Sequence, residues 1–426
     1  MNIWLSVLLW STYLMSLYFS VFWLLVFLDN SSGFFDRPKK TPKRTPLVTI
    51  IVPAKNEQDT ITGTLQSIIE LDYPADKIEL ISICNATTDK TAERVLEFIE
   101  AHPERDIRLI QTPEPGKGRA MNKALATAKG EFFACLDADS FVDSGSLKKM
   151  LAVFEEHDTN LAIVTPAMKI RSPKNLYQRL QRIEYMLSIF IGRLMSRIDC
   201  LYVAPGPFSV YRTETIRKIG GFDEHNITED MEIAYRCQKE HLKITQCPDA
   251  WVTTVGPATM KGLYNQRNRW FKGGLLNTIK YKSILANKRY GDFGMIQMSI
   301  NCLMFFFSST AILFFTYYMI WPMLTQFRDL YLIGFDIWPL LTHLQFKFSL
   351  LYIDIEKVLI ANFLMSLSLI FIWIAHKNAE ESIKQTRWTI IPYMFVYYLA
   401  LSLVALVVLA ETAMGKKPEW SDAKGE

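Results

Sequence analysis

The chain has 426 residues, half of them apolar, and a formal net charge of +4 at pH 7. That length exceeds one ordinary domain, and the small net charge argues against a nucleic-acid-binding protein. The six histidines show no HExxH spacing, so a zinc site is not expected.

The N-terminal residues 3–28 are almost purely apolar and aromatic, and the first charge is Asp29. Such a stretch can cross a bilayer core of ~30 Å. It lacks the basic start and the small-residue cleavage site of a signal peptide. We therefore expect a transmembrane helix over 1–29. A basic linker at 30–46 follows, and by the positive-inside rule it places the middle of the chain in the cytoplasm.

Short apolar, β-branched runs recur between residues 47 and 258, and helical patterns separate several of them. This alternation predicts a mostly parallel sheet covered on both faces, with ligands bound beyond the carboxyl ends of the strands. The expected strands are 47–53, 78–84, 107–111, 131–136 and 161–165, and the expected helices are 58–70 and 90–100.

Two carboxylates at alternate positions, Asp137 and Asp139, close one of the apolar runs. In an extended chain alternate side chains point the same way, so both can face one point. Mg²⁺ and Mn²⁺ favour carboxylate and phosphate oxygens, so the pair can hold a cation beside a leaving diphosphate. A solvated acidic loop is the competing interpretation.

A later acidic pair, Glu229 and Asp230, follows Thr228, which is a plausible helix N-cap. Acids in the first turn of a helix favour its dipole, and this alone can explain them. The functional interpretation makes Asp230 a general base that deprotonates an attacking hydroxyl.

The region 259–295 is basic and amphipathic, which suits a helix at the cytoplasmic membrane surface. Membrane binding does not explain why Gln266, Arg269 and Trp270 stand together. Arginine can bridge phosphate oxygens, and a tryptophan face can support the C–H surface of a sugar ring.

The region 296–412 contains uncharged stretches long enough to span a membrane, and a polar tail covers 413–426. The segment 331–352 carries Asp336, His343 and Lys347, which are costly in lipid, so a re-entrant or surface segment is expected there, with a full span as the less favoured alternative. The predicted spans are 298–323, 358–375 and 388–410. With the N-terminal helix they make four, which would leave the tail outside.

Seven short motifs together resemble the family 2 glycosyltransferases, in particular the membrane-integrated polysaccharide synthases that make poly-N-acetylglucosamine, cellulose, hyaluronan or chitin. The resemblance covers about residues 46–275. Its order and spacing are more specific than any single motif. The motifs begin at Val52 (VPAKNE), Gly116 (GKGRAMN), Asp137 (DAD), Gly206 (GPF), Gly220 (GGFD), Thr228 (TED) and Gln266 (QRNRW).

The resemblance implies a GT-A fold, an α/β nucleotide-diphospho-sugar transferase domain, on the cytoplasmic face. A transmembrane helical region and interfacial amphipathic helices would accompany it. In this family the residues matching Ala54 and Glu57 line the nucleotide pocket, and the lysine matching Lys117 lies near the nucleotide. Asp139 would bind Mg²⁺ or Mn²⁺, with Asp137 on the metal or the nucleotide. Members often have an aspartate where Asn85 stands here, and asparagine can still contact a pyrimidine edge.

The same resemblance implies residues for catalysis and for the acceptor. Asp230 would be the base, with Glu229 beside it. The diphosphate and acceptor would be held at the membrane surface by Gln266, Arg269 and Trp270, and the loop at 204–209, with Gly206 and Phe208, resembles one near the acceptor's terminal sugar.

We therefore expect a multi-pass cell-membrane enzyme with a UDP-sugar donor, which inverts the anomeric centre and extrudes a growing β-linked polysaccharide. UDP-N-acetylglucosamine and UDP-glucose are the favoured donors. A non-processive transferase that adds one sugar to a lipid-linked or glycolipid acceptor is the alternative. A membrane transporter or scaffold with an inert nucleotide-binding domain is an alternative of another class, against which Asp137, Asp139 and Asp230 argue. The expected partners are the donor, the polysaccharide or lipid-linked acceptor and membrane lipids. An accessory subunit or a homo-oligomer stays open, and no nucleic acid is expected.

Overall fold

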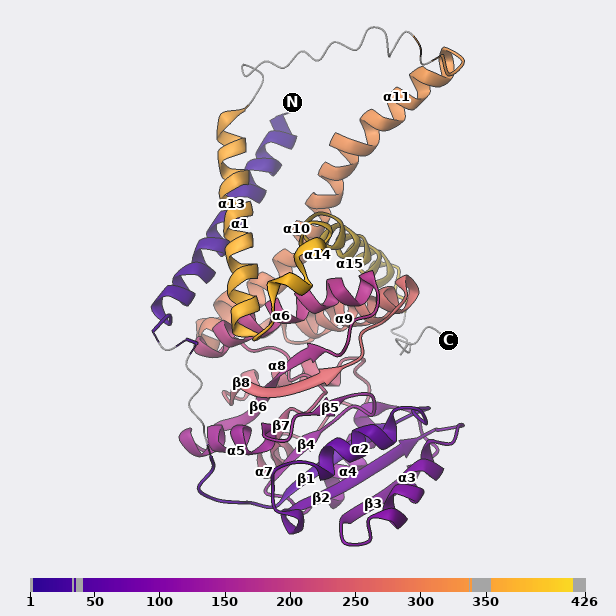
Figure 1. Ribbon diagram of the computed structural model, residues 1–426. Helices are drawn as coiled ribbons and strands as arrows, with labels where there is room; N and C mark the ends of the chain where they lie inside the picture. Colours follow the sequence, from indigo (N-terminus) through magenta and orange to yellow (C-terminus); the bar gives the residue numbers. More distant parts are fainter. Residues whose placement is uncertain (1–2, 33, 36–40, 337, 339–353, 417–426) are drawn as a thin grey trace.

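The structure is a computed structural model that describes residues 3–32, 34–35, 41–336, 338 and 354–416. An α/β region lies at one end of the molecule and long apolar helices rise from the other (Figure 1). The expected segment 331–352 falls largely outside the described residues. Its described start, 331–336, completes a helix and a turn.

One eight-stranded sheet forms the centre of the α/β region, in the order β3-β2-β1-β4-β7-β6-β8-β5. The expected strands are all present. The sheet is more mixed than expected, because β7 runs antiparallel to β4 and β6, and β5 runs antiparallel to β8. The strands are β1 (Val48–Ala54), β2 (Ile78–Asn85), β3 (Asp106–Thr112), β4 (Phe132–Cys135), β5 (Phe141–Val142), β6 (Leu161–Ile170), β7 (Val210–Arg212) and β8 (Lys243–Thr254).

Helices cover both faces of this sheet, because successive residues of the apolar strands point to opposite faces and both faces carry apolar side chains. Ile50 packs in a cluster with α2, α3 and α5, whereas its neighbour Ile51 packs with α4, α7 and α8. Both side chains are fully buried. The helices are α2 (Ile61–Ile69), α3 (Thr91–Ala101), α4 (Lys117–Thr127), α5 (Ser146–Glu156), α7 (Thr213–Lys218) and α8 (Glu229–Lys239).

Two long helices, α6 (Leu176–Arg197) and α9 (Met260–Lys280), lie between the sheet and the apolar helices (Figure 1). Each begins at a side-chain cap: the Asn175 side chain accepts from the Gln178 amide, and that of Thr259 from the Gly262 amide. They form a layer on which the apolar helices rest, since α6 packs against α13, and α9 against α15.

Within the described residues, four helices are long and apolar enough to cross a membrane. Three of these segments, α1, α10–α11 and α13, rise away from the α/β region (Figure 1). The second is one continuous helix of 40 residues, which at 1.5 Å per residue extends about 60 Å, twice a bilayer core. The 40-residue helix comprises η4 (Phe293–Gln297), α10 (Met298–Phe315), η5 (Thr316–Ile320) and α11 (Trp321–Leu332). The other two segments are α1 (Ile3–Asp29) and α13 (Ile355–Asn378).

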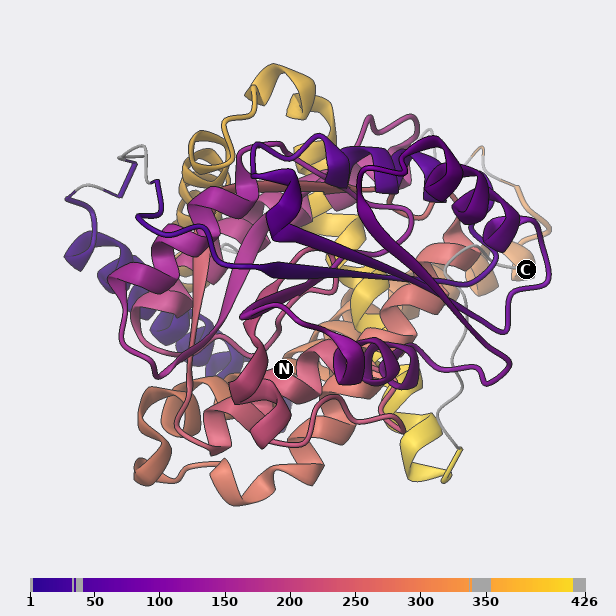
Figure 2. The ribbon, with the colours of Figure 1, turned by 90° about the horizontal axis from the view of Figure 1, so that it is seen from below.

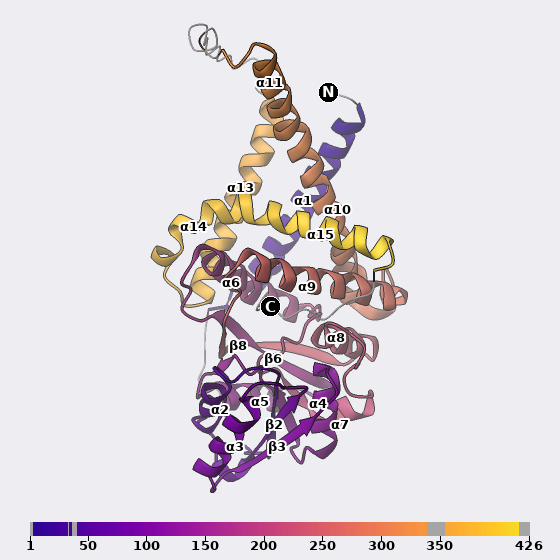
Figure 3. The ribbon, with the colours of Figure 1, turned by 90° about the vertical axis from the view of Figure 1, so that its right-hand side faces the viewer.

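The last apolar helix takes a different direction. It consists of α14 (Arg387–Pro392), η8 (Tyr393–Tyr397) and α15 (Tyr398–Ala413), and it lies across the base of the rising helices, above α9 (Figures 2 and 3). Glu411, near its end, lies 3.5 Å from the Lys272 ammonium of α9 and 3.4 Å from the Asn268 amide. The C-terminal end of α15 is therefore tied to the layer that covers the α/β region.

Candidate functional site

Lys117 joins two of the sequence motifs at the carboxyl end of β4. Its Nζ lies 2.5 Å from Asp137 Oδ1 and 3.3 Å from Glu229 Oε1. Burial lowers the pKa of Lys117, but the two carboxylates outweigh it, so the pKa is raised and the ammonium keeps its proton. A fixed positive charge therefore stands between the Asp137 motif and the first turn of α8.

Asp230 lies in that first turn, next to Glu229, and its Oδ1 accepts from the Met231 amide at 2.8 Å. Burial raises the pKa of Asp230, and the charge of Glu229 raises it further. Lys117 and Arg269 oppose the shift, which leaves the pKa at about 6. A carboxylate with that pKa is ionised near neutral pH and still basic enough to accept a proton, as a general base requires.

Residues 226–230, the loop that leads into the first turn of α8 and ends at Asp230, are held by α9. This segment is called the loop 226–230 below. Arg269 Nη1 donates to the Ile227 carbonyl at 3.3 Å, and Asn277 Nδ2 donates to Thr228 Oγ1 at 3.2 Å. Gly273 allows this approach, since a Cβ there would meet Thr228 Oγ1 at 2.2 Å. Thr228 stands at the N-cap, but its hydroxyl donates to Asn226 rather than capping the helix. The predicted base and the predicted diphosphate-binding helix thus form one packed unit.

The loop 204–209 also reaches this site, but its two predicted residues are placed differently. A Cβ at Gly206 would meet Lys117 Nζ at 2.7 Å and Asp137 Oδ2 at 3.2 Å, so this backbone passes directly beside the ion pair. Phe208 has a φ of 62° and a fully buried ring that packs among the core residues of the sheet. Gly206 therefore borders the site, whereas Phe208 anchors the loop behind it.

The predicted nucleotide-pocket residues lie at the ends of β1 and β2. The Glu57 carboxylate accepts a hydrogen bond from the Thr60 hydroxyl at 2.7 Å, and the Glu57 backbone amide donates to Thr91 Oγ1 at 2.8 Å. Asn85 is buried, and with its amide nitrogen turned toward Ala54 it donates to that carbonyl at 3.0 Å and accepts from the Gly116 amide at 3.3 Å. Asn85 thus links the two strands to the loop before Lys117.

Asp137 and Asp139 are partly exposed at the end of β4, and the structure pairs them differently. Asp137 faces Lys117, and Asp139 accepts from the Ser140 hydroxyl at 3.1 Å. Over the described residues, no group of three or more His, Cys, Asp or Glu side chains could hold a metal by itself. Two carboxylates fit Mg²⁺ or Mn²⁺ held jointly with substrate phosphate oxygens and water.

Gln266, Arg269 and Trp270 all lie on α9 and are partly buried. Arg269 reaches the loop 226–230, as described above. Gln266 and Trp270 contact Arg267 instead: its Nη1 donates to Gln266 Oε1 at 2.9 Å, and its guanidinium lies 4.1 Å from the centroid of the Trp270 ring. The structure therefore brings the α9 motif to the site through Arg269 and fixes its other members through Arg267.

Three residues that organise this site were not among the predicted site residues: Arg267, Gly273 and Asn277. Arg267 belongs to a run of basic residues on an amphipathic helix, for which a membrane surface is a sufficient explanation. A glycine inside a helical pattern indicates a close packing partner, so the sequence could have indicated the close approach at Gly273. No sequence pattern predicts the hydrogen bonds of Asn277 to the loop 226–230.

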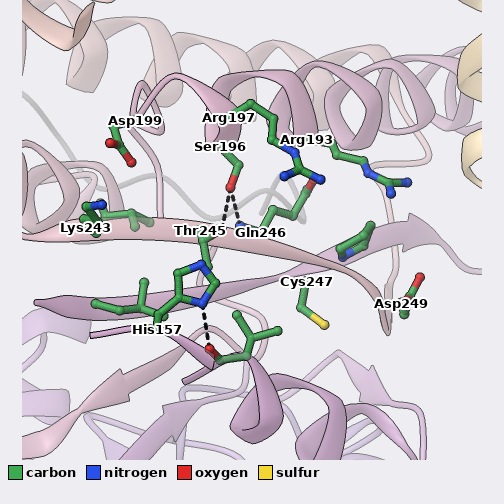
Figure 4. A pocket seen from close by; sticks show the side chains of 14 residues that line it. His157, Arg193, Ser196, Arg197, Asp199, Lys243, Thr245, Gln246, Cys247 and Asp249 are labelled. Atoms are coloured by element: carbon green, nitrogen blue, oxygen red, sulfur yellow. Dashed lines mark hydrogen bonds between the residues drawn. The ribbon is translucent and has the colours of Figure 1, made fainter. Parts of the chain in front are cut away.

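A cavity of about 500 Å³ lies away from this site, between the C-terminal end of α6 and the first half of β8 (Figure 4). Its lining carries charges of both signs, with the basic residues Arg193, Arg197 and Lys243 and the acidic residues Asp199 and Asp249. The predicted site residues do not line it, so the motifs and this cavity are separate features.

Comparisons with known proteins agree with the arrangement. The sequence profile described as "Glycosyltransferase like family 2" matches residues 45–273, more than half of the chain. A poly-β-1,6-N-acetyl-D-glucosamine synthase of Staphylococcus epidermidis is 29% identical over 283 residues, 63% of this chain and 67% of that protein. Its counterpart in Staphylococcus aureus strain MSSA476 is 31% identical over 53% of this chain and 54% of its own length. The matches thus span between half and two thirds of these curated relatives.

A solved structure, a mannosyltransferase from Pyrobaculum calidifontis in complex with GDP-Man and Mn²⁺, superposes with a TM-score of 0.60. It is 19% identical, and the superposition covers 96% of this chain and 99% of that one. At this identity the likeness concerns the fold. It confirms the expected GT-A fold, and it extends over the apolar helices as well.

Proposed function

The chain belongs to the family 2-like glycosyltransferases and is a glycosyltransferase, and from this premise we propose that it extends a β-linked polysaccharide from a nucleotide sugar. The observation that carries the proposal is the position of Lys117, bound to Asp137 on one side and Glu229 on the other, beside Asp230. The similarity to poly-β-1,6-N-acetyl-D-glucosamine synthases favours UDP-N-acetylglucosamine as donor, with UDP-glucose next.

Asp230 is the proposed base of an inverting displacement. It takes the proton from the acceptor hydroxyl while that oxygen attacks the anomeric carbon from the face opposite the diphosphate. The bond between the anomeric carbon and the diphosphate oxygen breaks, and the electron pair leaves with the diphosphate. The pKa of about 6 supports this role, because Asp230 is then mostly ionised at neutral pH.

The donor side of the site carries the groups for the leaving diphosphate. Lys117 is positively charged and Gly206 leaves room beside it, so a diphosphate can approach the ammonium. Asp137 and Asp139 would hold Mg²⁺ or Mn²⁺ together with diphosphate oxygens, and the bound cation supplies neutralisation of the leaving charge. Arg269 would contribute a second fixed cation from α9.

The acceptor side is assigned to α9. Trp270 offers an aromatic face of the kind that supports a sugar ring, and Gln266 offers amide donors on the same helix. Both lie on the layer between the α/β region and the apolar helices, so the acceptor would be extended next to the membrane.

We also propose that the catalytic region is cytoplasmic. The basic linker after α1 supports this side by the positive-inside rule. Helix α15 runs crosswise (Figure 3), and Lys416 lies 3.5 Å from Glu411, which pairs with Lys272 of α9, so this basic residue would stay on the cytoplasmic side. Four spans would instead leave the tail, and this charge, outside, where the positive-inside rule disfavours it. Membrane lipids would surround α1, α10–α11 and α13.

A second function is favoured by that same crosswise helix: transfer of a single sugar to a lipid-linked acceptor. Helix α15 packs along α9 and crosses the base of the rising helices, where a polymer produced at α9 would have to enter the membrane. A lipid-linked acceptor needs no such path, since its lipid stays in the bilayer. An accessory subunit or a second copy of the chain could supply the path for a polymer.

Detergent-purified protein incubated with labelled UDP-N-acetylglucosamine and Mg²⁺ or Mn²⁺ tests the two products. A labelled product that lengthens with time supports the polysaccharide. One sugar on a co-purified lipid supports the second function. Release of label as the free sugar alone, with no glycoside formed, would argue against both.

A further inference from the structure

Arg267 is the largest side chain among those that are almost completely buried, with 1% of its surface exposed. It stands between Gln266 and Trp270 on α9, the layer helix that carries the proposed acceptor site. A guanidinium keeps its charge inside a protein, so the buried charge of Arg267 has to be compensated by an opposite charge and by hydrogen bonds.

That compensation comes from helices on two sides. Arg267 Nη2 donates to Glu184 Oε2, on α6, and at 3.3 Å to Oη of Tyr397, the last residue of η8, directly before α15. The Tyr397 hydroxyl in turn donates to Glu184 Oε2 at 2.8 Å. Three elements that are far apart in the sequence therefore meet at one guanidinium.

The opposite side of the guanidinium faces the proposed acceptor residues. Nη1 donates to Gln266 Oε1 at 2.9 Å, which leaves the amide nitrogen of Gln266 to point elsewhere. The guanidinium plane lies over the Trp270 ring, 4.1 Å from its centroid. The first contact restricts the side-chain rotamer of Gln266, and the second restricts that of Trp270. In the proposed site Gln266 has to present its amide, and Trp270 its ring face, to the acceptor.

The energetics favour a positioning role over a stabilising one. Burial of an ion pair costs desolvation that its attraction often fails to repay, and apolar replacements are frequently as stable. Among the residues that the structure describes, none offers a hydrogen-bond partner to the Arg267 Nε, which adds to the cost. A cluster that is costly for stability and in direct contact with two site residues is best explained by the geometry it imposes.

We propose that Arg267, fixed by Glu184 and Tyr397, is the positioning residue for the acceptor site. It holds the Trp270 ring and the Gln266 amide in place and makes their orientation depend on how α15 packs over α9. The inference rests on the proposed function in one respect, since it takes Gln266 and Trp270 as the groups that meet the acceptor.

Tyr397→Phe tests this with a minimal change, because it removes one hydroxyl from the cluster and leaves the charges paired. Tyr398→Phe is the matched control: the neighbouring hydroxyl bonds Tyr393 at 3.1 Å and is not a partner of Arg267. Initial rates are measured with UDP-N-acetylglucosamine and a β-linked N-acetylglucosamine oligosaccharide as acceptor. We expect Tyr397→Phe to raise the acceptor KM about fivefold, the effect of one hydrogen bond, with the donor KM and the unfolding temperature close to wild type.

A second readout does not depend on turnover. With 5-fluorotryptophan incorporated, the ¹⁹F resonance of Trp270 is assigned by its loss in Trp270→Phe. It should shift or broaden in Tyr397→Phe and stay in place in Tyr398→Phe. An unmoved Trp270 resonance in Tyr397→Phe, or acceptor and donor KM values that rise together, would overturn the positioning role. Wild-type protein that turns over no nucleotide sugar would instead count against the proposed function, and the resonance would still decide this inference.

Discussion

Lys117 Nζ lies 2.5 Å from Asp137 Oδ1, although the two residues belong to motifs on different elements, α4 and the end of β4. The same ammonium reaches Glu229 at 3.3 Å, next to the proposed base. One partly buried cation therefore holds together the groups assigned to the donor diphosphate and those assigned to the acceptor hydroxyl. The Lys117 ion pairs thus bring motifs that are separate in the sequence into a single site.

Asp230→Asn should abolish transfer while donor binding survives. The substitution keeps the shape of the side chain and removes its ability to accept a proton, which is worth about 10²- to 10⁴-fold in rate. Transfer is followed with labelled donor, and donor binding by calorimetry on the same preparation. Transfer by Asp230→Asn at more than a tenth of the wild-type rate would remove Asp230 as the base.

The pH dependence of transfer should follow the ionisation of Asp230. Its pKa of about 6 lies above the ordinary value, so the active ionised form is lost as the pH falls through 6. Glu229 contributes to that raised pKa, and Glu229→Gln should therefore shift the midpoint of the kcat/KM profile to lower pH. A midpoint that stays in place or moves to higher pH in Glu229→Gln would contradict the charge coupling described for the site.

Gly273→Ala should impair transfer more than a change of one methyl group usually does. Its Cβ would fall 2.2 Å from Thr228 Oγ1, so α9 or the loop 226–230 must move, and Asp230 moves with it. Gly274→Ala is the control on the same helix, because its Cβ would meet the end of the Met231 side chain at ordinary contact distance, 3.7 Å from Sδ and 3.9 Å from Cε. We expect the Gly273 variant to lose at least about tenfold in kcat/KM, as small misplacements of catalytic groups do. Equal activities of the two variants would show that the close approach is not needed.

The end of α15 should lie on the same side of the membrane as the catalytic region. Helix α14–α15 is apolar enough to span, yet it runs across the base of the other helices, and its Glu411 pairs with Lys272 of α9. A cysteine introduced at Lys416, in a background where the exposed Cys302 is replaced, reports the side through a membrane-impermeant thiol reagent. Labelling only after permeabilisation of right-side-out cells agrees with this placement. Labelling of intact cells would show that the helix spans.

Much of the fold could be predicted, because the determinants are local. The apolar runs ending near Ala54 and Asp137 have the composition of buried strands, and they form β1 and β4. The order of the motifs predicted the GT-A fold, which the comparison confirms. The direction of α15 could not be predicted, since hydropathy reports that a helix is apolar and not how it lies.

The candidate site divides in the same way. Residues such as Asp137 and Asp230 carry chemistry that can be argued from residue type and spacing. Phe208 combines a positive φ with full burial, and the partners of Arg267 and Asn277 lie on elements distant in sequence. These positions are set by how α6, α9 and α15 approach one another, which only the folded chain shows.

The central claim is metal-dependent transfer from a UDP-sugar to a growing β-linked chain. The most direct test incubates purified wild-type protein with labelled UDP-N-acetylglucosamine, with Mg²⁺ or Mn²⁺ and with EDTA, and determines the length and linkage of the product. The account predicts a β-linked polymer of N-acetylglucosamine that grows with time and disappears with EDTA. A product with an α-linkage, or equal transfer in EDTA, would contradict it.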